Sequence, residues 1–304
     1  MTSRVLFIFL DGVGIGPPDP SVNPIAAAHL PQLEALIGAG RLITSEAISK
    51  DGLAGAAAID ACLGIPGLPQ SGTGQTTILT GVNAAEQIGR HFGPWVPTGV
   101  RELLMTRNIF GMARNAGIGV RFANAYPAMG SEREERVRRP GAFPLAARAA
   151  ESLDFEEEAV RRGDALVSSI TTESWRRHVD PGAPIVEPHE AGERLARMAA
   201  ANDLTIFAHY DTDYIGHRGT FGQAVAAMER VDTFLGGVVA RRSADTLVLV
   251  SSDHGNLEDT RGGHTRNPVP LIAFGPRHDE ALARIRTLTD LAPFILGRFG
   301  APGF

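Results

Sequence analysis

The segment VLFIFLD, residues 5–11, is a short apolar run that ends in an aspartate. Two more runs have the same form: LTIFA at 204–208 leads to Asp213, and TLVLV at 246–250 leads to Asp253. Short runs rich in Val, Ile and Phe are typical of strands buried on both faces, as in a parallel sheet. Because ligands of open α/β sheets bind beyond the carboxyl ends of the strands, we expect these acids to meet at one edge.

Histidines accompany these acids at spacings that suit metal ligation. His217 follows Asp213 by four residues, which places both side chains on one side of a helical turn. His254 directly follows Asp253, and His264 lies ten residues further on in a Gly-rich loop. A hydrogen-bonded structural role is an equally good interpretation of any one histidine. Taken as a set, the O and N donors predict two divalent metal ions, Mn or Zn.

Ser71 is the candidate nucleophile. It begins the segment SGTGQ ahead of a predicted helix that Gly81 would end. At the first turn of a helix its oxygen would lie near the positive end of the helix dipole, where backbone N–H groups also bind phosphate. The alternative is that Ser71 or Thr73 only caps the helix, and spacing alone does not choose between these roles.

Composition limits the classes of function. With 304 residues, 43% of them hydrophobic, the chain can form one large domain and a smaller one. The net charge of −5 argues against nucleic acid as the main partner. Cys62 is the only cysteine, which excludes an internal disulfide and a thiolate metal cage. Without a leader or a membrane-spanning run, we expect a cytoplasmic protein with no membrane partner; the sequence does not indicate its oligomeric state.

The stretches between the acid-tipped runs alternate between helix and strand patterns. Residues 31–37 and the amphipathic stretch 100–116 favour helices, and residues 119–124 favour a strand. Apolar residues from Ala224 to Val238 have the spacing of one helix face. Alternating strands and helices are typical of an α/β fold.

Residues 126–187 differ in character from both flanks. They are rich in Arg and Glu, as at 132–136 and 155–158, and contain few strand-like runs. We therefore divide the chain into a discontinuous α/β core, residues 1–125 and 188–304, and an inserted, mainly helical cap at 126–187. The alternative is a set of ordinary crossover helices within a single domain.

In this order the motifs resemble the alkaline phosphatase superfamily, and most closely its branch of cofactor-independent phosphoglycerate mutases and phosphopentomutases. The matching motifs are DGVG at 11–14, DHGN at 253–256, HTRNPVP at 264–270 and, less closely, FAHYDTDYIGH at 207–217. The resemblance covers the core at both ends of the chain and does not extend to the middle segment. It implies a three-layer α/β core, with a mostly parallel sheet between helices on both faces and a small cap.

The resemblance also implies roles for single residues. One ion would be held by Asp213, His217 and His264. The other would be held by Asp11, Asp253, His254 and the nucleophile. In the mutase branch the nucleophile precedes one Gly by three residues and a second by ten, as Ser71 precedes Gly74 and Gly81. The resemblance therefore selects Ser71, with Thr73 as the fallback.

The chain also departs from these families. It is too short for the large inserted domain of the phosphoglycerate mutases, and its only lysine, Lys50, lies outside every matching motif although those enzymes use an active-site lysine. Gln75 stands where they carry a histidine four residues after the nucleophile. The Ser71 segment lacks the Pro and Arg of the sulfatase motif, so hydrolysis of sulfate esters is not expected.

These observations predict a two-metal phosphoryl-transfer enzyme that acts on a small phosphorylated substrate. A phosphate-ester hydrolase with a phosphoseryl intermediate on Ser71 is favoured. The alternatives are a phosphomutase of the phosphoglycerate mutase or phosphopentomutase type, a phosphodiesterase and a non-catalytic metal-binding protein. Candidate substrate contacts, chosen for their nearness to the motifs, are Arg90, His91, Arg218 and Arg266. A surface role is an equal alternative for His91.

Overall fold

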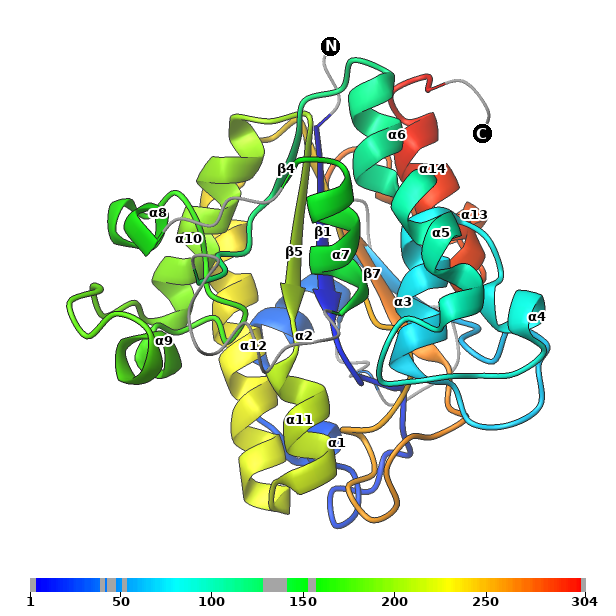
Figure 1. Cartoon of the computed structure of the whole chain (residues 1–304). Helices are drawn as coiled ribbons and strands as arrows, with labels where there is room; N and C mark the ends of the chain where they lie inside the picture. Colours follow the sequence, from blue (N-terminus) through cyan, green and yellow to red (C-terminus); the bar gives the residue numbers. More distant parts are fainter. Residues whose placement is uncertain are drawn as a thin grey trace.

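The computed structural model describes residues 4–38, 42, 48–50, 54–127, 141–152 and 157–301. Its centre is a seven-stranded sheet with the order β2-β3-β7-β6-β1-β5-β4. The strands are β1 Arg4–Leu10, β2 Ile48–Lys50, β3 Ala54–Ile59, β4 Val120–Phe122, β5 Leu204–His209, β6 Thr246–Ser251 and β7 Val269–Phe274. Figure 1 shows helices on both sides of this sheet, which gives three layers.

The three acid-tipped runs form the central strands β1, β5 and β6. They lie side by side and parallel, with Val5 paired to Leu204 on one side and to Leu247 on the other. β4 extends the parallel part beyond β5, whereas β7, β3 and β2 continue the sheet with antiparallel pairs. The predicted α/β class with a mostly parallel sheet is confirmed. Strand β3, AGAAAI, could not be predicted from the sequence, because Ala and Gly carry no strand signature.

Alternate residues of β1 point into two apolar clusters, one on each face of the sheet. Val5, Phe7 and Phe9 belong to the first cluster, and Leu6, Ile8 and Leu10 belong to the second. The covering helices are α1 Pro24–Ala27, α2 Pro31–Ile37, α3 Ser71–Thr80, α4 Ala84–Ile88, α5 Thr98–Thr106, α6 Ile109–Asn115, α7 Ala142–Ala149, α10 Pro188–Ala200, α11 Asp211–Arg218, α12 Phe221–Arg241, α13 His278–Arg284 and α14 Leu291–Gly297. This two-sided burial is what a strand of continuous apolar residues requires.

Two predicted helical stretches have different outcomes. The face from Ala224 to Val238 lies in the single helix α12, which Thr220 and Gln223 cap reciprocally. The stretch 100–116 is instead divided into α5 and α6, because the Asn108 side chain accepts hydrogen bonds from the first turn of α6 and starts a new helix there. In the part of the chain that the structure describes, no helix is both long and apolar enough to cross a membrane.

The segment assigned to the cap packs in two ways. Helix α7 lies against the sheet, where the Phe143 ring is 4.6 Å from that of Phe9. Helices α8 Glu157–Arg162 and α9 Glu173–His178 surround a separate small apolar cluster that includes Trp175 and stand away from the sheet in Figure 1. The Arg/Glu-rich run 132–136 and residues 155–156 lie outside the described residues. The core and cap boundaries stay a prediction.

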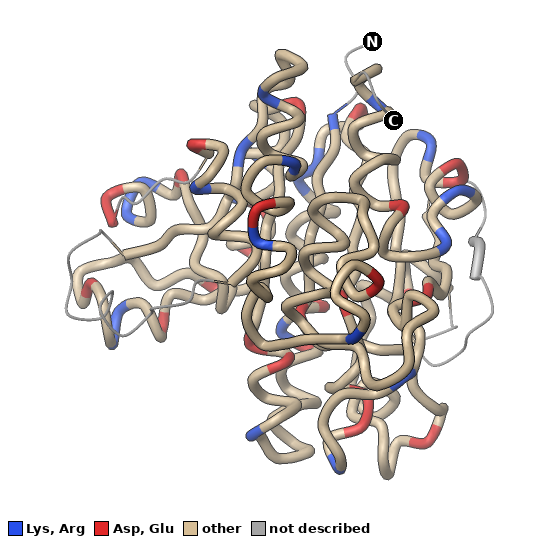
Figure 2. Tube along the Cα trace, turned by 45° about the vertical axis from the view of Figure 1, so that its right-hand side comes forward, with Lys and Arg blue, Asp and Glu red and all other residues tan. Residues whose placement is uncertain are grey.

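Charged residues of both signs are mixed over the chain (Figure 2). Figure 2 shows Lys and Arg interspersed with Asp and Glu over the described chain. Several of these pairs are helical neighbours, as in Arg177 with Glu173 and Arg194 with Glu190. Such exposed pairs contribute little to stability, so the charges of interest are the buried ones at the ends of the strands.

Candidate metal centre

Two groups of candidate metal ligands lie beyond the carboxyl ends of β1, β5 and β6. In each group one ligand atom from every residue lies within 4.8 Å of the others. The buried group consists of Asp11, Asp253 and His254, and the open group consists of Asp213, His217 and His264. The strand ends position Asp11, Asp253 and His254; helix α11 directly after β5 carries Asp213 and His217; and the loop between β6 and β7 carries His264. The structure thus brings together all six residues that the sequence analysis selected.

Ser71 lies beside the buried group. Its Oγ is 3.0 Å from His254 Nε2, and the same nitrogen is 3.5 Å from carboxylate oxygens of Asp11 and Asp253. Ser71 is the first residue of α3 and is itself buried. The Thr73 hydroxyl instead exchanges hydrogen bonds with the backbone of Gln70 and Phe92, which fastens the start of α3 to a neighbouring loop.

The buried group has an excess of negative charge. Burial, and then the nearby charge of Asp253, raise the pKa of Asp11 well above its usual value. The Gln75 amide donates to Asp11 Oδ2 at 3.0 Å and to Asp253 Oδ2 at 3.1 Å. Asp11 Oδ1 is buried and has no hydrogen-bond partner among the described residues. A divalent cation fits this arrangement, since it would supply that missing partner and neutralise both carboxylates.

The histidine of the buried group, His254, favours the neutral form that binds metal ions. Burial lowers the pKa of His254, so its neutral imidazole is favoured. A metal ligates the neutral ring through a nitrogen lone pair. His254 Nε2 faces Ser71, Asp11 and Asp253, which makes it the nitrogen available to an ion.

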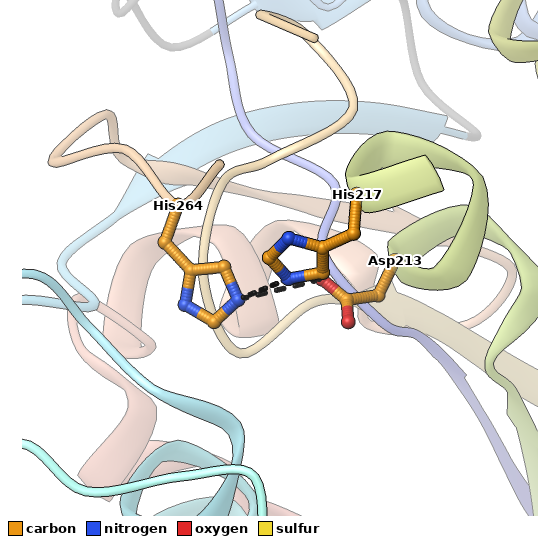
Figure 3. A group of neighbouring side chains, drawn as sticks. All are labelled: Asp213, His217 and His264. Atoms are coloured by element: carbon orange, nitrogen blue, oxygen red, sulfur yellow. Dashed lines mark hydrogen bonds and ion pairs between the residues drawn. The ribbon is translucent and has the colours of Figure 1, made fainter. Parts of the chain in front are cut away.

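Figure 3 shows the three side chains of the open group pointing towards one another. Asp213 Oδ1 is 3.5 Å from His217 Nε2 and 3.6 Å from His264 Nε2, and the two nitrogens are 2.9 Å apart. His264 Nδ1 donates to the Pro69 carbonyl at 2.7 Å, which leaves Nε2 as the lone-pair nitrogen of the neutral ring. His264 can therefore present Nε2 to an ion, and His217 Nε2 faces the same point.

Charges within the open group largely compensate one another. Burial alone would raise the pKa of Asp213, but the imidazoles of His264 and His254 and the amide of Asn256 bring it down to about 2. Burial would likewise lower the pKa of His264, but the Asp213 carboxylate beside it raises that pKa overall. A carboxylate next to a histidine that readily protonates forms a stable pair even without an ion.

The two groups share one wall. The rings of His254 and His264 stack with their centroids 3.7 Å apart. Asn256, two residues after His254, donates from Nδ2 to Asp213 Oδ1 at 2.7 Å. Any ions bound in the two groups would therefore be neighbours, as a two-metal site requires.

The predicted substrate contacts lie around the site and bind other partners. Arg90 and Arg218 lie over the rings of Phe92 and Tyr214, at 5.6 and 5.4 Å from the ring centroids respectively. The Arg266 guanidinium donates to the Gly67 carbonyl at 2.6 Å. His91 Nε2 is 3.1 Å from the Cys62 carbonyl oxygen and 3.3 Å from that of Ile65, so it ties that loop together. Their role towards a substrate stays a prediction.

Two buried polar side chains of the site were not assigned a role from the sequence. The sequence marks Gln75 only as a departure from a family pattern, and it predicts no role for Glu258. A helical position four residues after Ser71 could have suggested that Gln75 shares its face. The sequence does offer a signal for Glu258: it is an acid that closely follows a buried strand and an Asp-His pair, which suggests a place near the site.

Comparison with known sequences supports a metalloenzyme. Residues 183–302 match the family model of the metalloenzyme superfamily. Over 115 residues the chain is 39% identical to the 2,3-bisphosphoglycerate-independent phosphoglycerate mutase of Syntrophotalea carbinolica. This aligned segment covers 35% of this chain and 22% of that protein. Over 131 residues it is 41% identical to the mutase of the same name from Cereibacter sphaeroides, covering 40% of this chain and 24% of that protein. The matched segment thus spans about a quarter of the length of these curated relatives.

Solved structures with the same fold extend over nearly the whole chain. The PH0037 protein from Pyrococcus horikoshii superimposes with a TM-score of 0.58 and 15% identity, covering 100% of this chain and 98% of that one. The alkaline phosphatase from the Antarctic bacterium TAB5 gives a TM-score of 0.55 and 14% identity, covering 99% and 98%. At such identities the likeness concerns the fold alone. Residues 183–302 therefore match the metalloenzyme superfamily, and the chain has an alkaline phosphatase-like fold.

Proposed function

We propose that this protein is a two-metal phosphoryl-transfer enzyme with Ser71 as its nucleophile. The observation that carries the proposal is the position of the Ser71 hydroxyl, 3.0 Å from His254 Nε2 at the edge of the buried group. A serine at the start of a helix, beside carboxylates and an imidazole, is suited to attack phosphorus. The family model and the fold support this class of chemistry.

The chain's own residues fit two divalent ions, for which manganese and zinc are the candidates. We assign Asp11, Asp253, His254 and Ser71 to one ion and Asp213, His217 and His264 to the other. When bound, such ions lower the pKa of a ligating hydroxyl and neutralise charge on phosphoryl oxygens. Two observations support this assignment: Asp11 Oδ1 has no hydrogen-bond partner in the described part of the chain, and the rings of His254 and His264 stack.

Ser71 is held on a rigid element for this reaction. The start of α3 packs so closely on a loop that a Cβ at Gly72 would lie 2.0 Å from the Trp95 carbonyl oxygen. The Thr73 N–H donates to the Phe92 carbonyl at 2.9 Å. Ser71 Oγ would bond to phosphorus while the ester P–O bond breaks, and the positive end of the α3 dipole would stabilise the phosphoryl oxygens. Water would then break the Oγ–P bond and release inorganic phosphate.

Hydrolysis is the outcome that we propose for the phosphoseryl enzyme. The support is that Gln75 stands where the mutase branch carries a histidine, and that the only lysine lies outside the motifs. The specific alternative is a phosphomutase, because the curated relatives carry that name. Product analysis on small sugar phosphates and phosphoglycerates separates the two: a hydrolase releases one inorganic phosphate for each substrate consumed, and a mutase forms an isomer and none.

The nucleophile is tested with Ser71→Ala and, as its matched control, Thr73→Ala. With manganese or zinc and p-nitrophenyl phosphate, Ser71→Ala should lower kcat/KM by roughly 10³-fold or more, because the covalent step is lost. Thr73→Ala should lower it by about tenfold at most, since only a backbone tether is removed. Acid-quenched protein should carry labelled phosphate on Ser71. Full activity of Ser71→Ala, or label on Thr73, would contradict the assignment.

A further inference from the structure

Behind the two groups lies a buried carboxylate that the proposed chemistry does not use. The Glu258 side chain belongs to a residue with 0% of its surface exposed. Its Oε2 accepts hydrogen bonds from the backbone N–H groups of Gly14, at 2.9 Å, and Asn256, at 2.8 Å. Its Oε1 accepts from the Thr265 hydroxyl at 2.5 Å and from the Asn267 amide at 3.0 Å. Both oxygens are thus fully engaged as acceptors by neutral donors.

The surrounding loops are shaped to this carboxylate. A Cβ at Gly14 would lie 2.2 Å from Glu258 Oε1, and one at Gly255 would lie 2.1 Å from the same oxygen. A Cβ at Gly16 would lie 2.9 Å from the Cβ of Glu258. Because these three residues have no Cβ, the loops can pack closely against the Glu258 side chain. Displacing the carboxylate would displace the loops with it.

Each hydrogen-bond donor to Glu258 lies within three residues of a ligand. Gly14 follows Asp11 on the loop after β1, Asn256 follows His254 after β6, and Thr265 and Asn267 follow His264 before β7. One carboxylate therefore connects the loop after β1 with both ends of the loop between β6 and β7, and these segments carry ligands of both groups. The Asn256 side chain continues the connection to α11, where its Nδ2 donates to Asp213 Oδ1 at 2.7 Å.

We infer that Glu258 is a positioning residue that sets the separation of the two ions, an inference that rests on the proposed two-metal centre. An anionic carboxylate can accept from all four donors at once, which an amide or an apolar side chain cannot do in the same orientation. Outer partners of metal ligands typically change metal affinity by about 10- to 100-fold when they are removed. Glu258 holds whole loops, so its removal acts on both ions.

The variant Glu258→Ala tests this inference, with Asp232→Ala as its matched control. Asp232 is also a buried carboxylate that accepts from two backbone N–H groups, those of Gln32 and Leu33, but it joins α12 to α2. Both variants should lower the unfolding temperature of the ion-free protein. Only Glu258→Ala should weaken manganese binding, by about 10- to 100-fold in equilibrium dialysis. It should also reduce the spin exchange between the two manganese ions in the electron paramagnetic resonance spectrum.

Wild-type manganese affinity and wild-type spin exchange in folded Glu258→Ala would overturn the inference. If this variant does not fold, Glu258→Gln decides by the same two measurements, because it keeps the shape but turns an N–H₂ towards Thr265 and Asn267. Weaker binding with altered exchange supports the inference, and wild-type values overturn it. Failure of both variants to fold would overturn it too, since Glu258 would then serve the fold as a whole. Wild-type protein that binds fewer than two ions would instead contradict the proposed function, and with it the basis of this inference.

Discussion

The two ion groups use the same kinds of side chain in opposite surroundings. Asp253 and His254 of the buried group have 0% exposure, whereas the His217 side chain of the open group is 41% exposed. The residues of the buried group follow the ends of two adjacent strands, β1 and β6. Those of the open group lie on a helix and in a long loop. Burial makes the first group costly to leave without a cation, while the second is close to water.

Their ionisation follows this difference. Burial, and then the charge of Asp253, raise the pKa of Asp11, so the charged form of this carboxyl is costly in the ion-free protein. The pKa of Asp213 lies at about 2 because neighbouring imidazoles and an amide outweigh its burial. The buried group would thus need a bound cation for charge balance, whereas the carboxylate of the open group is balanced by its own histidines. Three sets of variants test this difference between the two groups.

The largest difference is expected in activity. Asp253→Asn should lower kcat/KM by roughly 10³-fold or more, because it removes a carboxylate ligand from the group that contains Ser71. His217→Ala should lower it by about 10- to 100-fold, since water can take the place of an exposed ligand. The measurement is kcat/KM for p-nitrophenyl phosphate at saturating manganese. Full activity of Asp253→Asn would contradict the two-metal proposal, and equal losses in both variants would remove the contrast between the groups.

A smaller and opposite effect is expected in the stability of the ion-free protein at neutral pH. Asp11→Asn should raise the free energy of unfolding by about 1–3 kcal/mol, because it removes a like charge from the buried group. It also replaces Oδ1, which has no hydrogen-bond partner among the described residues, or its companion oxygen with an N–H₂ donor. Asp213→Asn should lower it by about 1–2 kcal/mol, because the partner of His217 and His264 is lost. Urea unfolding in the presence of a chelator measures both.

The pH dependence of these two effects has opposite causes. The raised pKa of Asp11 means that this carboxyl holds its proton more tightly in the folded state than in the unfolded state. The wild-type protein therefore loses stability as pH rises above about 4. The gain in Asp11→Asn should therefore grow over that range. The depressed pKa of Asp213 contributes stability that is lost as pH falls from about 4 to about 2. A destabilising Asp11→Asn at pH 7 would show that the buried group carries no strain.

The part of this contrast that sequence could predict is which candidate ligands lie close together. Runs such as VLFIFL have few alternatives to a doubly buried strand, and an acid at the end of such a strand is placed by the direction of the chain. Burial of the individual ligands could not be predicted, because it depends on which loops cover them. The hydrogen-bond partners of Gln75 and Glu258 could not be predicted either, because they are far away in the sequence. Gln75 and Asp253 are 178 positions apart, and Glu258 and Gly14 are 244 apart. Only the assembled sheet brings such residues together.

The smallest effect is expected at Gln75, which partly offsets the charge of the buried group. Its amide donates to both Asp11 and Asp253, and its residue is buried. Gln75→Leu keeps a similar volume but removes both donors, so it should lower the free energy of unfolding of the ion-free protein by about 1 kcal/mol. Protein loaded with manganese should lose much less, because the two carboxylates then have cationic partners.

The comparison of loaded and ion-free protein is the critical measurement for Gln75. An equal loss in both states would mean that the Gln75 side chain only fills space, and that the charge of the buried group is balanced by other means. Gln75→Glu gives the reverse test, since a third carboxylate beside Asp11 and Asp253 should destabilise the ion-free state more than Gln75→Leu does. The same carboxylate should be tolerated better when manganese is bound. In the open group, where the histidines already oppose the charge of Asp213, adding or removing an ion should change stability less.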